Sequence, residues 1–245
     1  MSLNIPYLPP VTAPGGSLDL GIVYFDDFIT GGFARDLALS NESDPGGSKF
    51  SQVADVGEWL VTVTDTDGDD TYNVACADNA VGGWLVITNS NNAADKIEMQ
   101  INGEAFQAEA GKTLTFRTRI KLADADKQDW FIGLAITDTD IIGGVAERIG
   151  FECPDATADI DAVTEAGSTQ TTTDTGVNLA DDTFVELGFD VLGTGQVKFY
   201  VNGMLKATHT TNITTDILTP SLFVANSDAA LDTMTIDYIL AARDR

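Results

Sequence analysis

Phe184–Lys206, FVELGFDVLGTGQVKFYVNGMLK, carries two strands and their turns in one run. Apolar residues stand at every second position from 185 to 191 and again from 197 to 201, which is the period of strands that bury one face. Gly193-Thr194-Gly195 separates the two runs, and Asn202-Gly203 is a strong signal for a tight hairpin after the second run. The stretch predicts an antiparallel meander, and with it an all-β protein.

The same alternation appears on both sides of this meander. Thr113–Leu122 shows it most clearly, because its large apolar residues face one way and its basic residues the other. We expect these cations, Arg117, Arg119 and Lys121, to pair with carboxylates on neighbouring strands; a basic binding stripe is the alternative. Trp130–Thr137 is almost continuously apolar, which predicts a central strand buried on both faces.

Shorter apolar runs predict further strands, and no stretch has the period of an amphipathic helix. These strands are expected at Asp19–Thr30, Glu58–Val63, Gly83–Thr88, Lys96–Ile101, Ala146–Phe151, Thr208–Thr211, Leu222–Ala225 and Thr233–Leu240. Gly31–Lys49 has the composition of a loop. Asp155–Asp182 has few large apolar residues and much Thr, Asp, Ala and Gly, so we expect it to be an exposed excursion.

The chain suits one domain with an arm. Its 245 residues are 43% hydrophobic, and no linker interrupts the strand pattern, so we expect an extended Pro-rich arm at residues 1–20 and a β-sandwich domain at residues 21–245. An arm of this length reaches about 60 Å at about 3.3 Å per residue. A strap lying over its own domain is the alternative to an arm that binds a neighbour. The expected partner-binding anchors are Ile5, Pro6, Tyr7, Leu8 and Val11.

The net charge and the N-terminal sequence indicate which partners and which compartment to expect. The 38 acidic and 13 basic residues give a formal charge of −25, which repels phosphate backbones and anionic lipid heads, so we expect no nucleic-acid and no membrane partner. The first residues lack a basic n-region and an unbroken apolar h-region, so we expect synthesis in a cytoplasm without a signal peptide. Cys76 and Cys153 make no disulfide framework and are expected to be buried free thiols.

Four features in order along the chain resemble the concanavalin A-like lectin/glucanase superfamily, including its laminin-G-like members. They are FDDF at Phe25–Phe28, the strand at Trp59, GQVKFYVNG at Gly195–Gly203 and TIDYI at Thr235–Ile239. The resemblance implies a two-sheet antiparallel jelly-roll sandwich, in which the terminal strand lies near the first. The fold hosts hydrolases and lectins, so it does not decide the function.

Within this superfamily the chain is most similar to virion-associated copies in tailed bacteriophages, which are small, acidic and without an appended catalytic module. That similarity implies a capsid decoration, cement or head-surface protein located in the virion. Its expected partner is the major capsid protein or another virion protein, and it is expected to be a symmetric homo-oligomer. Carbohydrate binding at a surface glycan is the alternative function.

No catalytic site is expected. Glycoside hydrolases of this superfamily carry acids at alternate positions of one strand, and the chain has no ExDxE-like run. Glu186 and Asp190 share a strand face but stand about 13 Å apart at about 3.3 Å per residue, whereas retaining and inverting glycosidases use separations of about 5–9.5 Å. His209, the only histidine, is expected at an exposed strand edge or loop in a structural role.

No cofactor and no metal site are expected. The acidic turn Asp65–Asp70 is interpreted as a solvated turn, with a weak calcium site as the alternative. The aromatic candidates for sugar binding are Trp59, Trp84, Trp130, Tyr72 and Tyr200, although tryptophans within apolar strands belong more often to the core.

Overall fold

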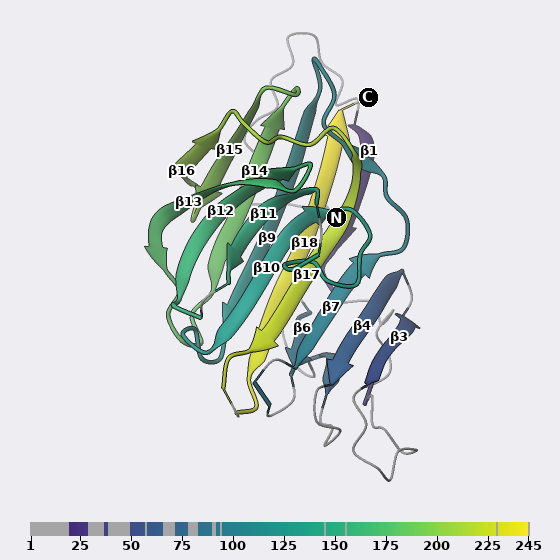
Figure 1. Ribbon diagram of the computed structural model, residues 1–245, viewed down its shortest axis with the longest axis vertical. Coiled ribbons are helices and arrows are strands. Elements are labelled where there is room, and N and C mark those ends of the chain that lie inside the picture. Colours follow the sequence, from purple (N-terminus) through teal and green to yellow (C-terminus); the bar gives the residue numbers. More distant parts are fainter. Residues whose placement is uncertain are drawn as a thin grey trace.

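The computed structural model (Figure 1) describes residues 20–28, 37–38, 50–56, 58–65, 72–77, 83–89, 92–93, 95–144, 146–154, 156–228 and 230–244. Within these ranges the chain forms strands and turns and no helix. Apart from Leu20, the expected arm lies outside the described residues. The same holds for its expected anchors Ile5, Pro6, Tyr7, Leu8 and Val11. The arm and its anchors therefore stay predictions. Most of the acidic turn Asp65–Asp70 also lies outside them.

The strands of the described residues follow one another from β1 near the N-terminus to β18 near the C-terminus. Their bounds are β1 Leu20–Asp26, β2 Leu37–Ala38, β3 Phe50–Val56, β4 Trp59–Asp65, β5 Asn73–Cys76, β6 Leu85–Thr88, β7 Lys96–Ile101, β8 Phe106–Gln107, β9 Thr113–Leu122, β10 Gln128–Ala135, β11 Arg148–Cys153, β12 Asp159–Ala166, β13 Thr169–Asn178, β14 Val185–Leu192, β15 Gln196–Val201, β16 Met204–His209, β17 Ile217–Asn226 and β18 Thr233–Asp244.

Two antiparallel sheets of nine strands each pack face to face (Figure 1). Sheet A has the order β16-β15-β14-β9-β18-β6-β5-β2, and β1 also pairs with β18; sheet B has the order β13-β12-β11-β10-β17-β7-β4-β3, and β8 also pairs with β17. This arrangement confirms the predicted jelly-roll sandwich, including the terminal strand beside the first. The core between the sheets contains Trp59, Trp130, Phe116, Phe151, Phe189 and Phe199, all at most 2% exposed.

The meander that predicts the fold class forms β14, β15 and β16 at one edge of sheet A. Asn202 and Gly203 have φ angles of 48° and 73°, which a two-residue type I′ hairpin turn requires and which this residue pair adopts at little strain. On the inner face, the rings of Phe116 and Phe189 stack with centroids 5.1 Å apart, and Phe199 meets Phe151 of sheet B at 5.4 Å. The meander therefore supplies aromatic contacts that join the two sheets.

The basic residues of β9 pair with carboxylates, as predicted. Arg117 lies 2.7 Å from Asp190 of β14, and Arg119 lies 2.7 Å from Asp237 of β18. Lys121 lies 3.0 Å from Asp182, which precedes β14. The three cations of β9 are thus paired with carboxylates, and no basic stripe remains on this strand.

The interpretation of Asp155–Asp182 as an exposed excursion is wrong, because this segment contains β12 and β13. β12 buries Ile160, Ala162 and Val163, but the rest of the strand consists of Asp, Thr, Glu and Ala, which gave a weak apolar signal. β13 is the outermost strand of sheet B and exposes most of its threonines, so it lacks the alternation of a half-buried strand. The two-residue strand β2 lies within Gly31–Lys49, which was expected to be a loop. The strands β3, β5 and β8 were also not predicted, since none of them contains a clear apolar run.

The prediction that His209 is exposed is wrong, although its role is structural. The side chain is buried, with 3% exposure, and packs 4.9 Å from the ring of Phe199. Its Nδ1 lies 2.9 Å from Thr164 Oγ1 and its Nε2 lies 3.0 Å from Thr173 Oγ1. Because His209 belongs to sheet A and both threonines to sheet B, the imidazole links the two sheets at their shared edge.

This link predicts a pH-dependent contribution to stability. Burial lowers the pKa of His209, so the folded protein holds the neutral ring and its stabilising contribution is lost as the pH falls below the unfolded pKa of about 6.5. We expect the difference in unfolding free energy between the wild type and His209→Gln to shrink from pH 7.5 to pH 5, by at most about 1.4 kcal/mol for each unit by which the pKa is lowered. Urea denaturation at both pH values measures it, and a difference that does not change with pH would contradict the expectation.

Candidate functional site

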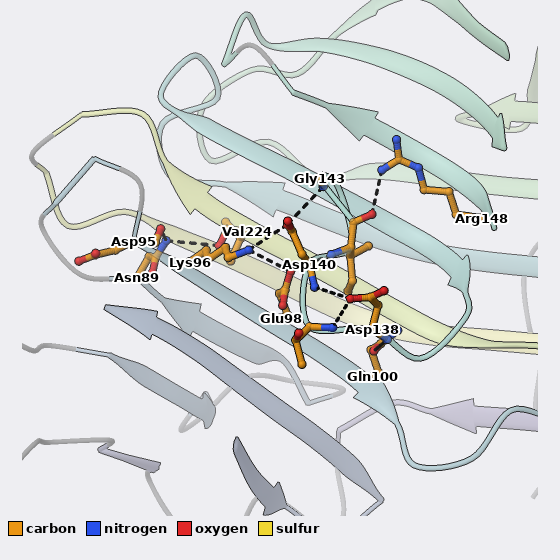
Figure 2. Close-up of polar contacts among 12 residues, drawn as sticks. Asn89, Asp95, Lys96, Glu98, Gln100, Asp138, Asp140, Gly143, Arg148 and Val224 are labelled. Atoms are coloured by element: carbon orange, nitrogen blue, oxygen red, sulfur yellow. Dashed lines mark hydrogen bonds and ion pairs between the residues drawn. The ribbon is translucent and has the colours of Figure 1, made fainter. Parts of the chain in front are cut away.

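The outer face of sheet B carries several buried polar side chains, among them Glu98, Gln100, Arg148 and Glu152. Strands β7, β10, β11 and β17 are buried along almost their whole length, whereas β9 at the centre of sheet A buries only alternate residues. The cover comes from residues 136–144, which leave β10 and fold back over the sheet before β11 (Figure 2). We call residues 136–144 the covering loop.

The covering loop is held on β7 by hydrogen bonds from its backbone. Ile141 N donates to Glu98 Oε1 at 2.9 Å. Asp138 N donates to Gln100 Oε1 at 2.9 Å (Figure 2). In return, Gln100 Nε2 donates to Ile136 O at 2.9 Å. Burial raises the pKa of Glu98, and the hydrogen bond from Ile141 N opposes this shift. Side chains of β7 therefore satisfy backbone groups of the loop that would otherwise face a buried surface.

An ion pair and an apolar cluster complete the attachment of the loop. Lys96 Nζ lies 3.0 Å from Asp140 Oδ1, and Arg148 Nη1 donates to Ile141 O at 3.0 Å. Ile141 is fully buried. It belongs to a cluster on the outer face of sheet B that also contains Phe131, Ala135, Val163, Phe223 and Ala225. The loop thus fills this part of the face with packed side chains.

Two glutamates share one arginine beside the covering loop. Arg148 Nη2 lies 3.2 Å from Glu152 Oε2, and Arg148 Nε lies 2.8 Å from Glu165 Oε2. Gln170 Nε2 of β13 donates to Glu152 Oε1 at 2.5 Å. The Arg148 and Glu152 side chains are only 3% and 2% exposed. Burial raises the pKa of Glu152, with a smaller contribution from Asp161, and the charge of Arg148 acts in the opposite direction.

The absence of a side chain at Gly150 lets the Phe131 ring and the Arg148 guanidinium pack directly on the backbone of β11. Gly150 stands between Arg148 and Glu152 on β11, and a Cβ atom there would lie 2.5 Å from Ile132 O and 2.8 Å from the Phe131 ring. The ring therefore rests on the backbone, and the Arg148 guanidinium lies 5.6 Å from its centroid. These contacts fix the guanidinium between the two carboxylates.

The arrangement is suited to structure rather than acid–base chemistry. A glycosidase needs two carboxyl groups that face a sugar from either side of the scissile bond. Here Arg148 forms ion pairs with both Glu152 and Glu165. The sequence analysis missed this group, and the available signal was an arginine on a strand with a glutamate four residues later, in a chain with only 13 basic residues.

Glu186 and Asp190, the acidic pair considered from the sequence, lie on β14 of sheet A. Asp190 pairs with Arg117 on the outer face of sheet A, and Glu186 stands opposite Arg119 in the register of β14 and β9. Neither approaches Arg148, Glu152 or Glu165, which belong to sheet B. The thiols Cys76 and Cys153 are both free, the first half-buried and the second buried.

Among the three tryptophans, only Trp84 is near the surface. Trp59 and Trp130 are core residues, as expected of tryptophans in apolar strands. Trp84 is half-buried and meets Phe184 edge to face, with centroids 5.3 Å apart. Arg119 lies 4.1 Å from the Phe184 centroid and Lys121 lies 5.7 Å from the Trp84 centroid. The four side chains form an aromatic and cationic patch on sheet A.

Solved structures with similar folds come from proteins of different kinds. The SO2946 protein of unknown function from Shewanella oneidensis MR-1 has a TM-score of 0.53 and 15% identity, over 91% of this chain and 86% of that one. SCLam, a non-specific endo-β-1,3(4)-glucanase of family GH16, has a TM-score of 0.55 and 15% identity, over 94% and 93%. The carbohydrate recognition domain of Emp47p has a TM-score of 0.53 and 7% identity, over 77% and 89%. At these identities the similarity shows the fold alone, a concanavalin A-like jelly roll.

Sequence comparison adds the family. No curated protein sequence matches the chain. Within the described residues there is no helix of the length and hydropathy that a membrane span requires. Residues 79–238, more than half of the chain, match the SO2946-like C-terminal domain, and the protein therefore belongs to the SO2946-like family.

Proposed function

We propose that this protein is a non-enzymatic structural protein of a tailed-bacteriophage virion, which decorates or cements the capsid by docking on the major capsid protein. The observation that carries this function is an exposed apolar strand, β1, directly after the expected arm. Ile22, Val23 and Phe25 of β1 are 40%, 47% and 39% exposed. Among the described strands, β1 pairs only with β18, so its other edge has no described partner.

The sandwich supports a docking function more than a catalytic one. The covering loop fills part of the outer face of sheet B, and Arg148 is paired with the two buried glutamates beside it. On sheet A, Asp190, Asp237 and Asp182 are likewise paired with Arg117, Arg119 and Lys121. None of these carboxylates has the partner-free, substrate-facing position that a general acid or base needs.

The expected partner surface follows from the chemistry of the arm and β1. Ile5, Tyr7, Leu8 and Val11 in the arm and the exposed residues of β1 make one continuous stretch of sequence with apolar anchors. They fit an apolar groove on the capsid protein. With a formal charge of −25, the rest of the chain favours a rim of basic residues around that groove.

Mass action explains how such docking stabilises a capsid. A protein that binds only the assembled shell stabilises it by RT ln(1 + [L]/Kd). A symmetric homo-oligomer would present several arms to the lattice at once, and the local concentration of the second arm then exceeds that in solution. Weak contacts of single arms can therefore give stable attachment.

Deleting residues 1–16 is expected to reduce the occupancy of empty capsids to background without unfolding the sandwich. Cosedimentation of the purified variant with capsids measures occupancy, and far-UV circular dichroism measures the fold. Val23→Ser with Phe25→Ser should lower occupancy at least tenfold, the effect of about 1.4 kcal/mol. Ile217→Ser, at an exposed residue of β17, is the matched control and should bind like the wild type. Unchanged occupancy after the deletion would remove the arm from the docking surface.

A carbohydrate-binding adhesion function is the second candidate, and the aromatic and cationic patch favours it. Trp84 and Phe184 provide aromatic surface beside the ion pair of Lys121 with Asp182. The similar solved structures include a carbohydrate recognition domain and a glucanase. A glycan array tests this function. Saturable binding to a glycan that is lost in Trp84→Ala, together with no binding to empty capsids, would favour carbohydrate binding over capsid docking.

A further inference from the structure

The covering loop brings an aspartate to a lysine that stands beside a buried glutamate. Lys96 and Glu98 are two residues apart on β7, so their side chains share the outer face of sheet B. Lys96 Nζ lies 3.0 Å from Asp140 Oδ1 of the covering loop and 3.6 Å from Glu98 Oε1 (Figure 2). An amine, a carboxylate and a second carboxyl group therefore meet at one point.

The surroundings of this group keep most of the water away from the lysine and the glutamate. The Lys96 side chain is 19% exposed, and its Nζ lies 5.8 Å from the centroid of the Phe223 ring. The Glu98 side chain is 1% exposed, and its Oε2 is buried without a hydrogen-bond partner. Holding opposite charges in such a place costs desolvation free energy, whereas a neutral amide has no charge to desolvate.

The backbone of the covering loop fixes the Asp140 carboxylate. Gly143 N donates to Asp140 Oδ1 at 3.2 Å, and Gly144 N donates to the backbone oxygen of Asp140 at 2.8 Å (Figure 2). A Cβ atom at position 143 would lie 2.6 Å from Asp140 Oδ2, so a glycine is needed for this close approach. A backbone N–H at a carboxyl oxygen stabilises the negative charge that develops there when a nucleophile attacks the carboxyl carbon.

We propose that Lys96 Nζ and Asp140 Cγ condense to an amide bond, which ties the covering loop covalently to β7. The bond from Nζ to Cγ forms and the bond from Cγ to Oδ2 breaks, while Oδ1 stays as the amide oxygen beside Gly143 N. The ammonium group gives up two protons, and the leaving oxygen takes up both and departs as water. Since an ion pair becomes a neutral amide and one water molecule, the reaction needs no oxidant and no cofactor.

Glu98 is the group that moves these protons. An ammonium is not a nucleophile, so a base must take a proton from Lys96 Nζ and an acid must protonate the leaving oxygen. Burial raises the pKa of Glu98, with a smaller contribution from Asp140, whereas the hydrogen bond from Ile141 N and the charge of Lys96 act in the opposite direction. The fold supplies the rest, because well-oriented groups within one molecule react as if at concentrations of about 10⁵–10⁸ M.

The ion pair of Lys121 with Asp182 on sheet A provides an internal comparison. Its two atoms are also 3.0 Å apart. The Asp182 side chain, however, is 73% exposed, and among the described residues no glutamate forms an ion pair with Lys121. We expect this second pair to stay ionic, because it lacks the buried carboxyl group that carries the protons.

The test is the mass of the intact, denatured full chain. We expect it to be lower than the mass calculated from the sequence by one water molecule. After digestion with trypsin, the peptide of residues 128–148 should be joined to the peptide that contains Lys96, because trypsin does not cleave after an acylated lysine. A mass equal to the calculated one would overturn the cross-link, and so would a loss of water that tandem mass spectra place at other residues.

Three variants separate this reaction from ordinary ion pairing, with far-UV circular dichroism as the check on folding. Lys96→Arg keeps a cation beside Asp140 but has no nucleophilic amine, so it should have its full calculated mass. Glu98→Gln keeps the acceptor for Ile141 N but cannot carry protons. In cell-free synthesis followed by mass spectrometry, it should form the cross-link about a hundredfold more slowly than the wild type. Lys121→Arg is the matched control and should lose one water molecule. Loss of water in Lys96→Arg would overturn the cross-link, and an unchanged rate in Glu98→Gln would overturn the role of Glu98.

Discussion

Replacing Arg148 with methionine is expected to lower the free energy of unfolding by about 3–5 kcal/mol. The substitution keeps most of the aliphatic volume but leaves Glu152 and Glu165 as buried carboxylates without their shared cation. It also removes the hydrogen bond from Arg148 Nη1 to Ile141 O, which holds the covering loop. The midpoint of guanidinium unfolding measures the loss.

The control for this substitution is Arg119→Met on sheet A. Arg119 also pairs with a carboxylate, Asp237, but its side chain is 38% exposed, so the expected loss is below about 1 kcal/mol. The loss in Arg148→Met should grow from pH 4 to pH 7. Burial raises the pKa of Glu152 in the folded protein, so Glu152 becomes neutral at low pH and then loses little when the cation is absent. At pH 7 the variant must instead bury a charged carboxylate without its cation. Equal losses for the two arginine variants would show that burial does not strengthen the Arg148 pairs.

Phe199→Ala is expected to lower the unfolding free energy by about 3–5 kcal/mol, the range for a large aromatic residue removed from a packed core. The ring is fully buried and contacts rings from both sheets, Phe189 at 5.8 Å and Phe151 at 5.4 Å. It also packs against His209, so the cavity would weaken the link between the sheet edges. Thermal and urea unfolding measure the change.

The neighbouring residue Tyr200 provides the matched comparison, because it points away from the core on the same strand and lies 5.6 Å from the Arg117 guanidinium. Tyr200→Ala should destabilise by about 1 kcal/mol or less, since it removes a cation–π contact at a half-buried site. Phe199→Leu should lose less than Phe199→Ala, because it leaves a smaller cavity. A loss in Tyr200→Ala as large as that in Phe199→Ala would contradict the assignment of the inner face.

Where side chains alternate, the sequence predicted the fold well. β7 and β9 begin and end at the predicted residues, and the Asn202-Gly203 hairpin has the expected turn. Alternation is readable because a half-buried strand repeats every two residues. β12 and β13 could not be found this way, because small residues, threonines and an exposed sheet edge leave no such period.

The polar groups of sheet B were beyond sequence reasoning for a different reason. Arg148 and Glu152 are near in sequence, but Glu165 and Gln170 reach them only through the pairing of β11, β12 and β13. Likewise, the register of β10 with β17 sets Gln128 beside Asn226 across almost a hundred residues of chain. His209 shows the same limit, because its partners Thr164 and Thr173 lie in strands that the sequence analysis did not assign.

The position of β18 governs when the molecule can fold during synthesis. β18 pairs with β1, β6 and β9, and β17 pairs with β7 and β10, so the two strands made last join the parts of both sheets. Neither sheet can become continuous until nearly the whole chain has left the ribosome. Until β18 is available, the apolar side chains of β1 stay in water. Chains that depend on such long-range strand pairing fold slowly and are prone to aggregate. Nascent chains that stall before residue 233 would therefore be natural clients for chaperones.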